Sequence, residues 1–192
     1  MVELSDAVRG WVPVSACLAP VALIGGWTVA AAQQPGNFDP LHQTISALAA
    51  TGAGDRWIMT AALAILGLCH LATAAGLTAA GRGSRMVLGA GGIATVAVAA
   101  LPQPNAGHVP AATLGFVALS LWPVGSMRSQ RPTRIALTAA LLGLLAWLAI
   151  ALQTGSLIGL AERVLAGAQA FAPLVFCVVT IWNADRLTAA RR

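Results

Sequence analysis

The polar stretch Asn37–Ser46 (NFDPLHQTIS) contains the residues best suited to chemistry, although apolar segments lie on both sides of it. Asp39 and His42 supply a carboxylate and an imidazole, which are common groups in general acid–base catalysis. His42 and Ser46 are four residues apart, so on a helix they would share a face as a base and a nucleophile. The stretch is therefore a candidate catalytic segment.

Asp39 and Pro40 also have a purely structural explanation. Asp is a favoured N-cap and Pro suits the first helical position, so they predict a short helix from Pro40 to about Ala50. Gly52 and Gly54 would end that helix. The apolar residues of this connector argue against disorder. We expect it to lie on the membrane surface or to dip between helices as a re-entrant segment.

Two further positions carry groups that suit a site. His108 follows the break Pro102–Asn105, where it is predicted either to make a local hydrogen bond or to join His42 in a site. Glu162 lies roughly 9 Å inside the last apolar segment, given a rise of about 1.5 Å per residue. Ionisable groups at that depth usually face the interior of a bundle, where they are functional or paired. The alternative for Glu162 and Arg163 is therefore an interhelical ion pair that fixes packing.

His70 is expected to stay apart from these groups. It follows Trp57 by thirteen residues, which is roughly 20 Å along a helix. Gly67, His70 and Ala74 share a helical face, which predicts a buried histidine hydrogen-bonded to a neighbouring helix. The depth of His70 also argues against a three-histidine zinc site, because zinc catalysts normally have three protein ligands.

No cofactor is predicted from the sequence. The HExxH, P-loop, GxSxG and dinucleotide-binding signatures are missing. Cys17, Cys69 and Cys177 lie inside apolar segments without CxxC spacing, which argues against a disulfide framework or a structural zinc site. We predict no metal site, and a bound divalent metal is the alternative.

The composition excludes a water-soluble domain. The 192 residues are 58% hydrophobic and 9% charged, whereas a soluble domain has about 25% charged residues. The formal charge of +5 comes from eleven arginines and no lysine. These arginines lie in short connectors, so membrane topology explains them better than nucleic-acid binding does. We expect membrane lipids, and no nucleic acid, as partners.

Six apolar segments approach or exceed the length of about 20 residues that crosses a bilayer. They predict an all-α fold in which residues 1–192 form one polytopic domain of six transmembrane helices, with a short helical or re-entrant segment in the first connector. The predicted spans are residues 11–32, 57–80, 86–101, 109–126, 135–152 and 157–182. Interfacial positions are predicted for the tryptophans near span ends, which are Trp11, Trp57, Trp122 and Trp182.

The arginines predict the orientation in the membrane. With six spans, one side holds nine arginines and the other holds only Arg56 and Arg163. Positive residues accumulate on the cytoplasmic side, so we predict a multi-pass protein of the cell inner (plasma) membrane with both termini cytoplasmic. The nine are Arg9, Arg82, Arg85, Arg128, Arg131, Arg134, Arg186, Arg191 and Arg192.

This topology brings most of the chemically capable side chains to the outer leaflet. We expect the catalytic groups to converge in one cavity, within roughly 10 Å of one another. They are Asp39, His42, His108 and Glu162. The predicted substrate-binding residues are Thr44, Ser46, Asn105, Gln153, Arg163 and Gln169. Gly and Ala along the spans permit close helix packing, and with it self-association into a homo-oligomer.

Three motifs, in this order, resemble the domain-of-unknown-function 998 family, a group of small six-helix membrane proteins of prokaryotes. They are DPLHQTISALAATGAGDRW in the first connector, LPQPNAGHVPAA before the fourth span and GLAERVL at the start of the sixth, and the similarity runs from about residue 12 to 184. The family's pattern has an acidic residue after the TIS triplet. Ala47 stands there in this chain, so any role of that acid would be lost. The family also looks distantly like the Frag1/DRAM group, some members of which are linked to lipid-anchor remodelling, but the resemblance implies no activity.

Three classes of function fit these residues. The first is an enzyme that acts by acid–base chemistry on a hydrophobic small-molecule substrate, a lipid or isoprenoid, with hydrolysis, acyl transfer and terpenoid cyclisation not distinguished. The second is a non-catalytic lipid-binding or membrane assembly protein that uses the same polar groups for recognition and packing. The third is a small transporter, although the two three-helix halves show no convincing repeat.

Overall fold

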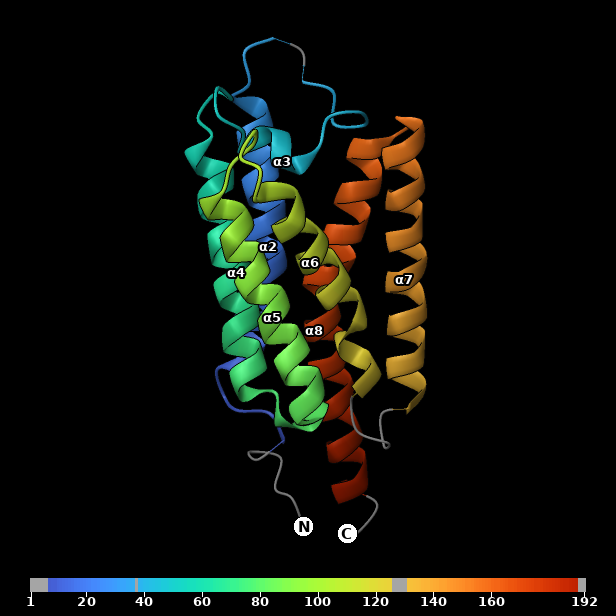
Figure 1. The fold of residues 1–192 in the computed structure, drawn as a ribbon. Helices are drawn as coiled ribbons and strands as arrows, with labels where there is room; N and C mark the ends of the chain where they lie inside the picture. Colours follow the sequence, from blue (N-terminus) through green and yellow to red (C-terminus); the bar gives the residue numbers. More distant parts are fainter. Residues whose placement is uncertain (1–6, 37, 126–130, 190–192) are drawn as a thin grey trace.

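The computed structural model describes residues 7–36, 38–125 and 131–189, which contain helices and no strand (Figure 1). The α-helices are α2 (Val12–Ala32), α3 (Ile45–Leu48), α4 (Trp57–Gly76), α5 (Gly81–Ala100), α6 (His108–Leu121), α7 (Arg131–Thr154) and α8 (Ile158–Ala189). Two 3₁₀ turns, Thr78–Ala80 and Trp122–Gly125, follow α4 and α6. Three arginines used in the orientation prediction lie outside the described residues: Arg128, Arg191 and Arg192.

Six segments are long and apolar enough to cross a membrane, one for each α-helix other than α3, with the 3₁₀ turns counted together with α5 and α6. The predicted all-α bundle of six membrane helices is therefore confirmed. The third span starts earlier than predicted, at Gly81, and the fifth covers Arg131–Thr154 instead of residues 135–152. Polar residues were expected to end these spans. A helix can nevertheless continue past the apolar region, because long side chains such as that of Arg82 extend toward water.

The corner between α4 and α5 shows why the second predicted span, residues 57–80, is too long. α4 ends at Gly76, and the chain turns through residues 78–80 to Gly81, whose φ of 75° suits glycine. The Arg85 guanidinium donates hydrogen bonds of 2.6 Å to the carbonyl oxygens of Ala74 and Ala75. These carbonyls belong to the last turn of α4, where helical acceptors lack partners of their own.

Close contact between α4 and α5 depends on a pair of glycines. A Cβ atom added to Gly67 would lie 2.7 Å from the Gly92 oxygen, and one added to Gly92 would lie 2.8 Å from the Gly67 oxygen. Small residues allow two membrane helices to approach until their backbones touch. This contact places the middle of α4, including His70, directly against α5.

Trp122 is not interfacial, unlike the other tryptophans near span ends. It is fully buried, whereas Trp11, Trp57 and Trp182 are each about half exposed or more. The Trp122 ring packs edge-on against Phe176, with ring centroids 5.5 Å apart. The 3₁₀ turn at the end of α6 directs this ring into the bundle, so the interfacial prediction for Trp122 is wrong.

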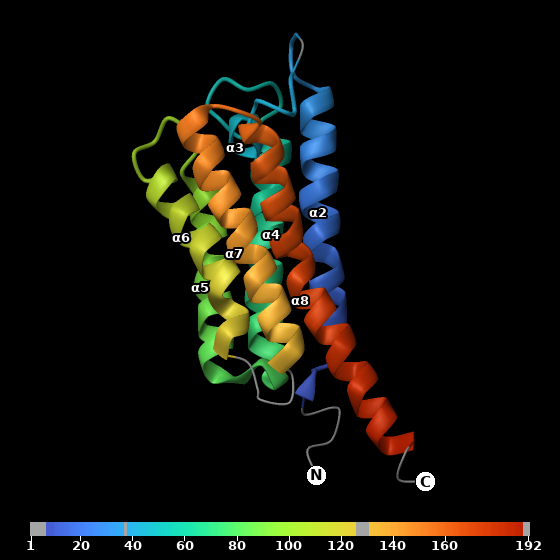
Figure 2. The same ribbon diagram turned by 90° about the vertical axis from the view of Figure 1, so that its right-hand side faces the viewer.

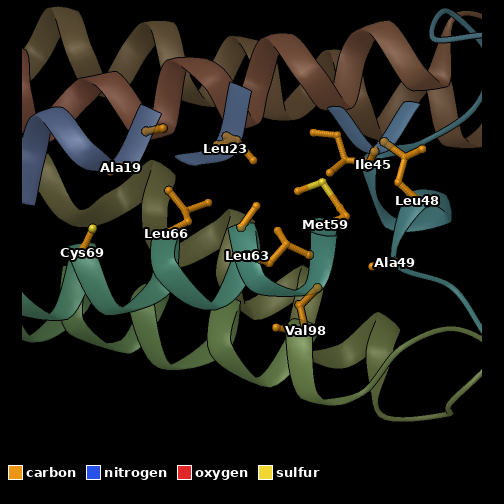
Figure 3. Packing of buried hydrophobic residues seen from close by; sticks show 14 residues of the cluster. Ala19, Leu23, Ile45, Leu48, Ala49, Met59, Leu63, Leu66, Cys69 and Val98 are labelled. Atoms are coloured by element: carbon orange, nitrogen blue, oxygen red, sulfur yellow. The ribbon is translucent and has the colours of Figure 1, made fainter. Parts of the chain in front are cut away.

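The short helix α3 closes one end of the bundle. Leu48 and Ile45 are 0% and 3% exposed, and they pack with Met59 of α4 at the end of an apolar cluster that continues toward Leu23 and Leu66 (Figure 3). The α3 part of the first connector therefore dips between the long helices.

The two ends of the bundle differ in what they carry. α3 and the connectors next to it lie at one end, together with the start of α8, while α2 starts and α8 ends at the other (Figure 1). We call these the α3 end and the terminal end. The turned view shows α8 beside both α2 and α7, with its last turns reaching beyond the neighbouring helices (Figure 2).

Candidate functional site

The first connector does not form the helix predicted from Pro40. The Asp39 carboxylate accepts a hydrogen bond of 2.9 Å from the Leu41 N–H, which closes a turn that competes with helix formation. The helix starts at Ile45, and Thr44 is its N-cap, accepting at Oγ1 from the Ala47 N–H at 3.1 Å. His42 therefore precedes the helix, and the predicted base–nucleophile face is absent.

Asp39 and His42 form an ion pair on the surface. Asp39 Oδ2 lies 2.7 Å from His42 Nδ1, and the two side chains are 51% and 54% exposed. The hydrogen bond with His42, followed by the one from Leu41, lowers the pKa of the Asp39 carboxyl below its ordinary value. Water screens such a pair and supplies hydrogen bonds of its own.

Glu162 lies in the second turn of α8 and holds α3 in place. Its side chain is 6% exposed. One carboxylate oxygen accepts a hydrogen bond from the Ile45 N–H, and the other accepts from the Ser46 hydroxyl at 3.2 Å. These partners are a backbone amide and a hydroxyl, not the cation of the predicted interhelical ion pair. The carboxylate thus links two segments more than a hundred residues apart.

Arg163 holds the preceding part of the connector. Its Nη1 donates to the carbonyl oxygens of Pro40 at 2.8 Å and Gln43 at 2.7 Å, and to Gly159 at 3.0 Å. The guanidinium also lies 5.5 Å from the centre of the Phe38 ring. Arg163 is thus occupied with the backbone of the connector, whereas a role in binding substrate was predicted and stays a prediction.

Gly159 completes this contact because its lack of a side chain lets the connector reach the α8 backbone. A Cβ at this position would lie 2.6 Å from the Pro40 oxygen, with the Gln43 oxygen also in its path. One residue later, the Leu160 N–H donates to the Leu41 oxygen at 3.1 Å. We call the contact of residues 38–46 with Gly159, Leu160, Glu162 and Arg163 the connector clamp.

Beneath α3 lies a cavity of about 50 Å³, large enough for a few water molecules. We call it the inner cavity. Apolar side chains and one glycine make up most of its wall: Leu23, Ile45, Leu63, Leu66, Val98, Ala112, Gly115, Phe116, Leu119 and Ala166. Its polar residues come from four helices and are Ser46, His70, Thr95, Glu162 and Gln169.

A separate pocket of about 140 Å³ lies between α6, α7 and α8 at the α3 end. We call it the side pocket. Its polar residues are Thr44, Ser46, Gln103, His108, Thr113 and Glu162, and its apolar residues are Val109, Ala112, Phe116, Leu148, Leu152 and Ile158. Ser46, Ala112, Phe116 and Glu162 line both hollows, so the Glu162 carboxylate lies where the inner cavity adjoins the side pocket.

His108 has one nitrogen held and one nitrogen free. The ring is 2% exposed, and Nδ1 lies 2.8 Å from the Leu101 carbonyl oxygen. A carbonyl only accepts, so Nδ1 carries the proton and Nε2 of the neutral ring keeps its lone pair. Nε2 has no partner among the described residues. The sequence left a local hydrogen bond and a site shared with His42 as alternatives for His108. The local hydrogen bond is present, and His42 does not line the pocket that His108 lines.

The predicted convergence of Asp39, His42, His108 and Glu162 in one cavity is found for two of the four side chains, and their catalytic roles stay predictions. Glu162 and His108 both line the side pocket, but Asp39 and His42 line neither hollow. The turn that Asp39 closes keeps this pair on the outer surface of the connector. Their nearness along the chain carried no information about which side of the connector the two side chains would occupy.

His70 contradicts the prediction made for it. The side chain is 1% exposed and lines the inner cavity together with Glu162. Neither ring nitrogen has a hydrogen-bond partner among the described residues, so the expected bond to a neighbouring helix is absent. Each unpaired buried polar group costs about 1–3 kcal/mol. The depth argument holds for His42 and His108, which do not line this cavity, but it fails for Glu162, because the inner cavity extends inward along α8 from Glu162 to Gln169.

The predicted substrate-binding residues fall into two groups. Thr44 and Ser46 line the side pocket, and Gln169 lines the inner cavity, where its Nε2 donates to the Phe116 oxygen at 2.8 Å and the Ser120 hydroxyl at 3.0 Å. Asn105 and Gln153 are exposed and line neither hollow. Asn105 instead closes its own loop, accepting at Oδ1 from the Gly107 N–H at 2.8 Å.

Sequence reasoning also missed Thr95, Gln103 and Thr113 as lining residues. No spacing in the sequence marks them, whereas the rule that ionisable residues inside a membrane are candidate site residues would have selected His70. Across residues 7–36, 38–125 and 131–189, no three His, Cys, Asp or Glu side chains are grouped as a metal ion would require.

Comparison with known proteins identifies the family. Residues 17–179 match the family model described as "Protein of unknown function (DUF998)", so the chain belongs to this family. No curated protein and no solved structure matches the chain. The distant likeness to the Frag1/DRAM group stays a prediction.

Proposed function

We propose that this member of a family of unknown function is a membrane-embedded enzyme that acts on a lipid or isoprenoid by acid–base chemistry. Glu162 and His108 are the catalytic groups of the proposal. One observation carries it: a buried carboxyl group and a buried imidazole, 54 positions apart in the sequence, line the same pocket, which has an apolar wall on its other side.

The hydrogen bonds around the two groups support complementary roles. His108 is oriented by the Leu101 carbonyl and keeps an unpaired Nε2, which is the arrangement of a general base. Glu162 is oriented by Ile45 and Ser46, so its carboxyl group is fixed at the pocket wall. Hydrolysis, acyl transfer and cyclisation of an isoprenoid all use such a pair, and the residues do not select one of them.

The position of the side pocket supports entry of the substrate from the bilayer. Val109 and Leu152, which line it from α6 and α7, are 65% and 61% exposed on the apolar outside of the bundle. A hydrophobic substrate could thus reach Glu162 without crossing a water layer. The polar wall, formed by α3 and the start of α6, would meet its reactive group.

The arginines support the side of the membrane on which this chemistry occurs. Among the described residues, the terminal end carries Arg9, Arg82, Arg85, Arg131, Arg134 and Arg186, and the α3 end carries Arg56 and Arg163. By the positive-inside rule, the terminal end is cytoplasmic and the site belongs to the outer leaflet of the plasma membrane.

A glutamine substitution at Glu162 tests the proposal. In Glu162→Gln, the amide oxygen can still accept from the Ile45 N–H and the amide nitrogen can donate to the Ser46 hydroxyl, but proton transfer is lost. We expect the wild-type protein, expressed in a host that lacks it, to change the lipid fraction, and Glu162→Gln to form that product at least about 10²-fold more slowly. Mass spectrometry of lipid extracts measures this, and Asp39→Asn is the matched control, expected to match wild type.

A specific observation favours the alternative of a non-catalytic lipid-binding or assembly protein. Both oxygens of Glu162 already accept hydrogen bonds from α3, so the residue could serve only to hold the connector. In that case the lipid fraction would not change on expression, or Glu162→Gln would retain the whole effect at equal protein levels. Either result would contradict the enzyme proposal.

A further inference from the structure

Among the residues that the structure describes, one polar residue of the inner cavity has no hydrogen-bond partner. Ser46 and Glu162 bond to each other, Thr95 donates to the Gly91 oxygen at 2.9 Å, and Gln169 donates to α6. His70 alone in this lining has no partner among the described residues, although it is 1% exposed. An imidazole without a partner in such a place is suited to a ligand.

The site around His70 restricts the chemistry of that ligand. A neutral imidazole offers one N–H donor and one bare nitrogen acceptor, so it binds a hydroxyl through either and a carbonyl through the donor. A charged group is costly near the middle of a membrane. The wall around His70 is apolar, with Leu63 and Leu66 from α4 and Val98 from α5. The group that fits is therefore an uncharged oxygen function on an apolar chain.

The lining residues on α8 show how far the inner cavity extends along the bundle. Glu162 and Gln169 line the cavity seven residues apart on one helix, which corresponds to about 10 Å. Ser46, Ala112, Phe116 and Glu162 are shared with the side pocket. The inner cavity of about 50 Å³ has room only for the end of such a chain, which His70 would meet, while the rest of the chain would lie in the side pocket of about 140 Å³.

We propose that His70 is a ligand-binding residue that receives a hydroxyl or carbonyl group of an uncharged, lipid-soluble chain whose other part lies at Glu162. This inference rests on the proposed function, since it assumes that the cavity accepts the substrate chain. It narrows the substrate class to lipids or isoprenoids with an oxygen function in the apolar part, away from the reacting end.

Binding of two matched probes tests this proposal. The isoprenoid alcohol farnesol carries a hydroxyl, and the hydrocarbon farnesene has a similar chain without one. Tritiated farnesol is bound to the purified full-length protein in detergent by scintillation proximity, and farnesene is titrated as competitor. We expect wild type to prefer farnesol, and His70→Phe to lose about tenfold in farnesol affinity with no change for farnesene.

Further variants keep the outcome clear. Leu68→Phe places the same ring two residues away on α4, at a side chain that is 57% exposed, and should bind as wild type does. If His70→Phe does not fold, His70→Gln replaces it and should keep part of the preference for farnesol.

The outcomes separate the two proposals. Equal affinity of wild type for both probes, or unchanged farnesol affinity in folded His70 variants, overturns the role of His70 and leaves the role of Glu162 intact. Failure of wild type to bind either probe counts against the proposed function as well. Loss of lipid product in Glu162→Gln with no effect of His70 on binding would place the substrate in the side pocket alone.

Discussion

Two carboxylate–histidine sets lie at the α3 end, and they differ in almost every property that matters for chemistry. Asp39 and His42 are three residues apart, touch each other at 2.7 Å and are about half exposed. Glu162 and His108 are far apart in sequence, are 6% and 2% exposed, and are each held by groups other than one another. Spacing along the chain favours the exposed set as a site, whereas burial and pocket geometry favour the buried set.

The two sets differ in whether a side chain keeps an unpaired atom that could react. Asp39 and His42 satisfy each other in water, where an ion pair contributes little and substrates compete with solvent. His108 lines the side pocket with one nitrogen bonded to the backbone and the other without a partner among the described residues. A pocket-lining side chain that the backbone orients and that keeps an unpaired atom is a better sign of function than direct contact between two exposed side chains.

The largest effect is expected when His108 is replaced by asparagine, and the same replacement at His42 serves as the comparison. His108→Asn keeps an amide donor near the position of Nδ1 for the Leu101 carbonyl but lacks the free ring nitrogen, so we expect product formation to fall by about 10²- to 10⁴-fold. His42→Asn should change it less than about threefold, because His42 lines neither hollow. Mass spectrometry of the lipid product measures both rates.

Equal losses in the two variants would reverse this comparison, since the exposed pair would then matter as much as the buried set. Both proteins must be present at equal levels with wild-type unfolding temperatures. Losses that disappear after correction for protein amount would instead assign His108 to stability.

The connector clamp predicts a smaller effect, on stability. Gly159→Ala directs a Cβ at the Pro40 and Gln43 carbonyl oxygens, and backbone atoms cannot move aside as a flexible side chain can. We expect a loss of about 1–3 kcal/mol in the free energy of unfolding, the usual cost of an overpacked contact. Thermal unfolding in detergent, with the midpoint as the readout, measures it.

Gly143→Ala is the matched control on α7. No heavy atom lies within 4 Å of a Cβ added at this glycine, so the substitution should be neutral or stabilise by up to about 1 kcal/mol through helix propensity. If Gly159→Ala unfolds at the same temperature as Gly143→Ala, the clamp does not determine the position of the connector.

Much of the fold was predictable because membrane insertion depends on composition over long windows. Apolar segments of sufficient length revealed all six spans, and Leu41, Ile45 and Leu48 indicated an ordered connector. The ends of the spans were less predictable. Arg85 bonds to carbonyls of α4 and lies within the helix α5, whereas its charge had suggested a position outside a span.

The site was only partly predictable, since its membership depends on which way side chains face across helices. The depth of Glu162 along α8 correctly predicted that its side chain faces the interior of the bundle. Depth along α4 correctly separated His70 from His42 and His108 but not from Glu162, because helix length measures position along the bundle and not the extent of a cavity. The unpaired nitrogens of His70 and His108 depend on the absence of a partner among the described residues, which no local pattern of residues encodes.

The smallest expected effect is on the titration of Asp39, and it tests whether the exposed pair of Asp39 and His42 behaves independently of the buried set. The hydrogen bond from His42 lowers the pKa of Asp39, so its contribution to stability is present above the unfolded pKa of about 3.9 and is lost as the pH falls through the lower folded pKa. In an NMR titration of the Asp39 carboxyl carbon, we expect a midpoint below about 3.9 that rises toward this value in His42→Ala. Because solvent screens this pair, acidification through the same range should release it while leaving the contacts of Glu162 with Ile45 and Ser46 in place. A common transition of the Asp39 carboxyl carbon and the Ile45 amide would show instead that the two sets act as one unit.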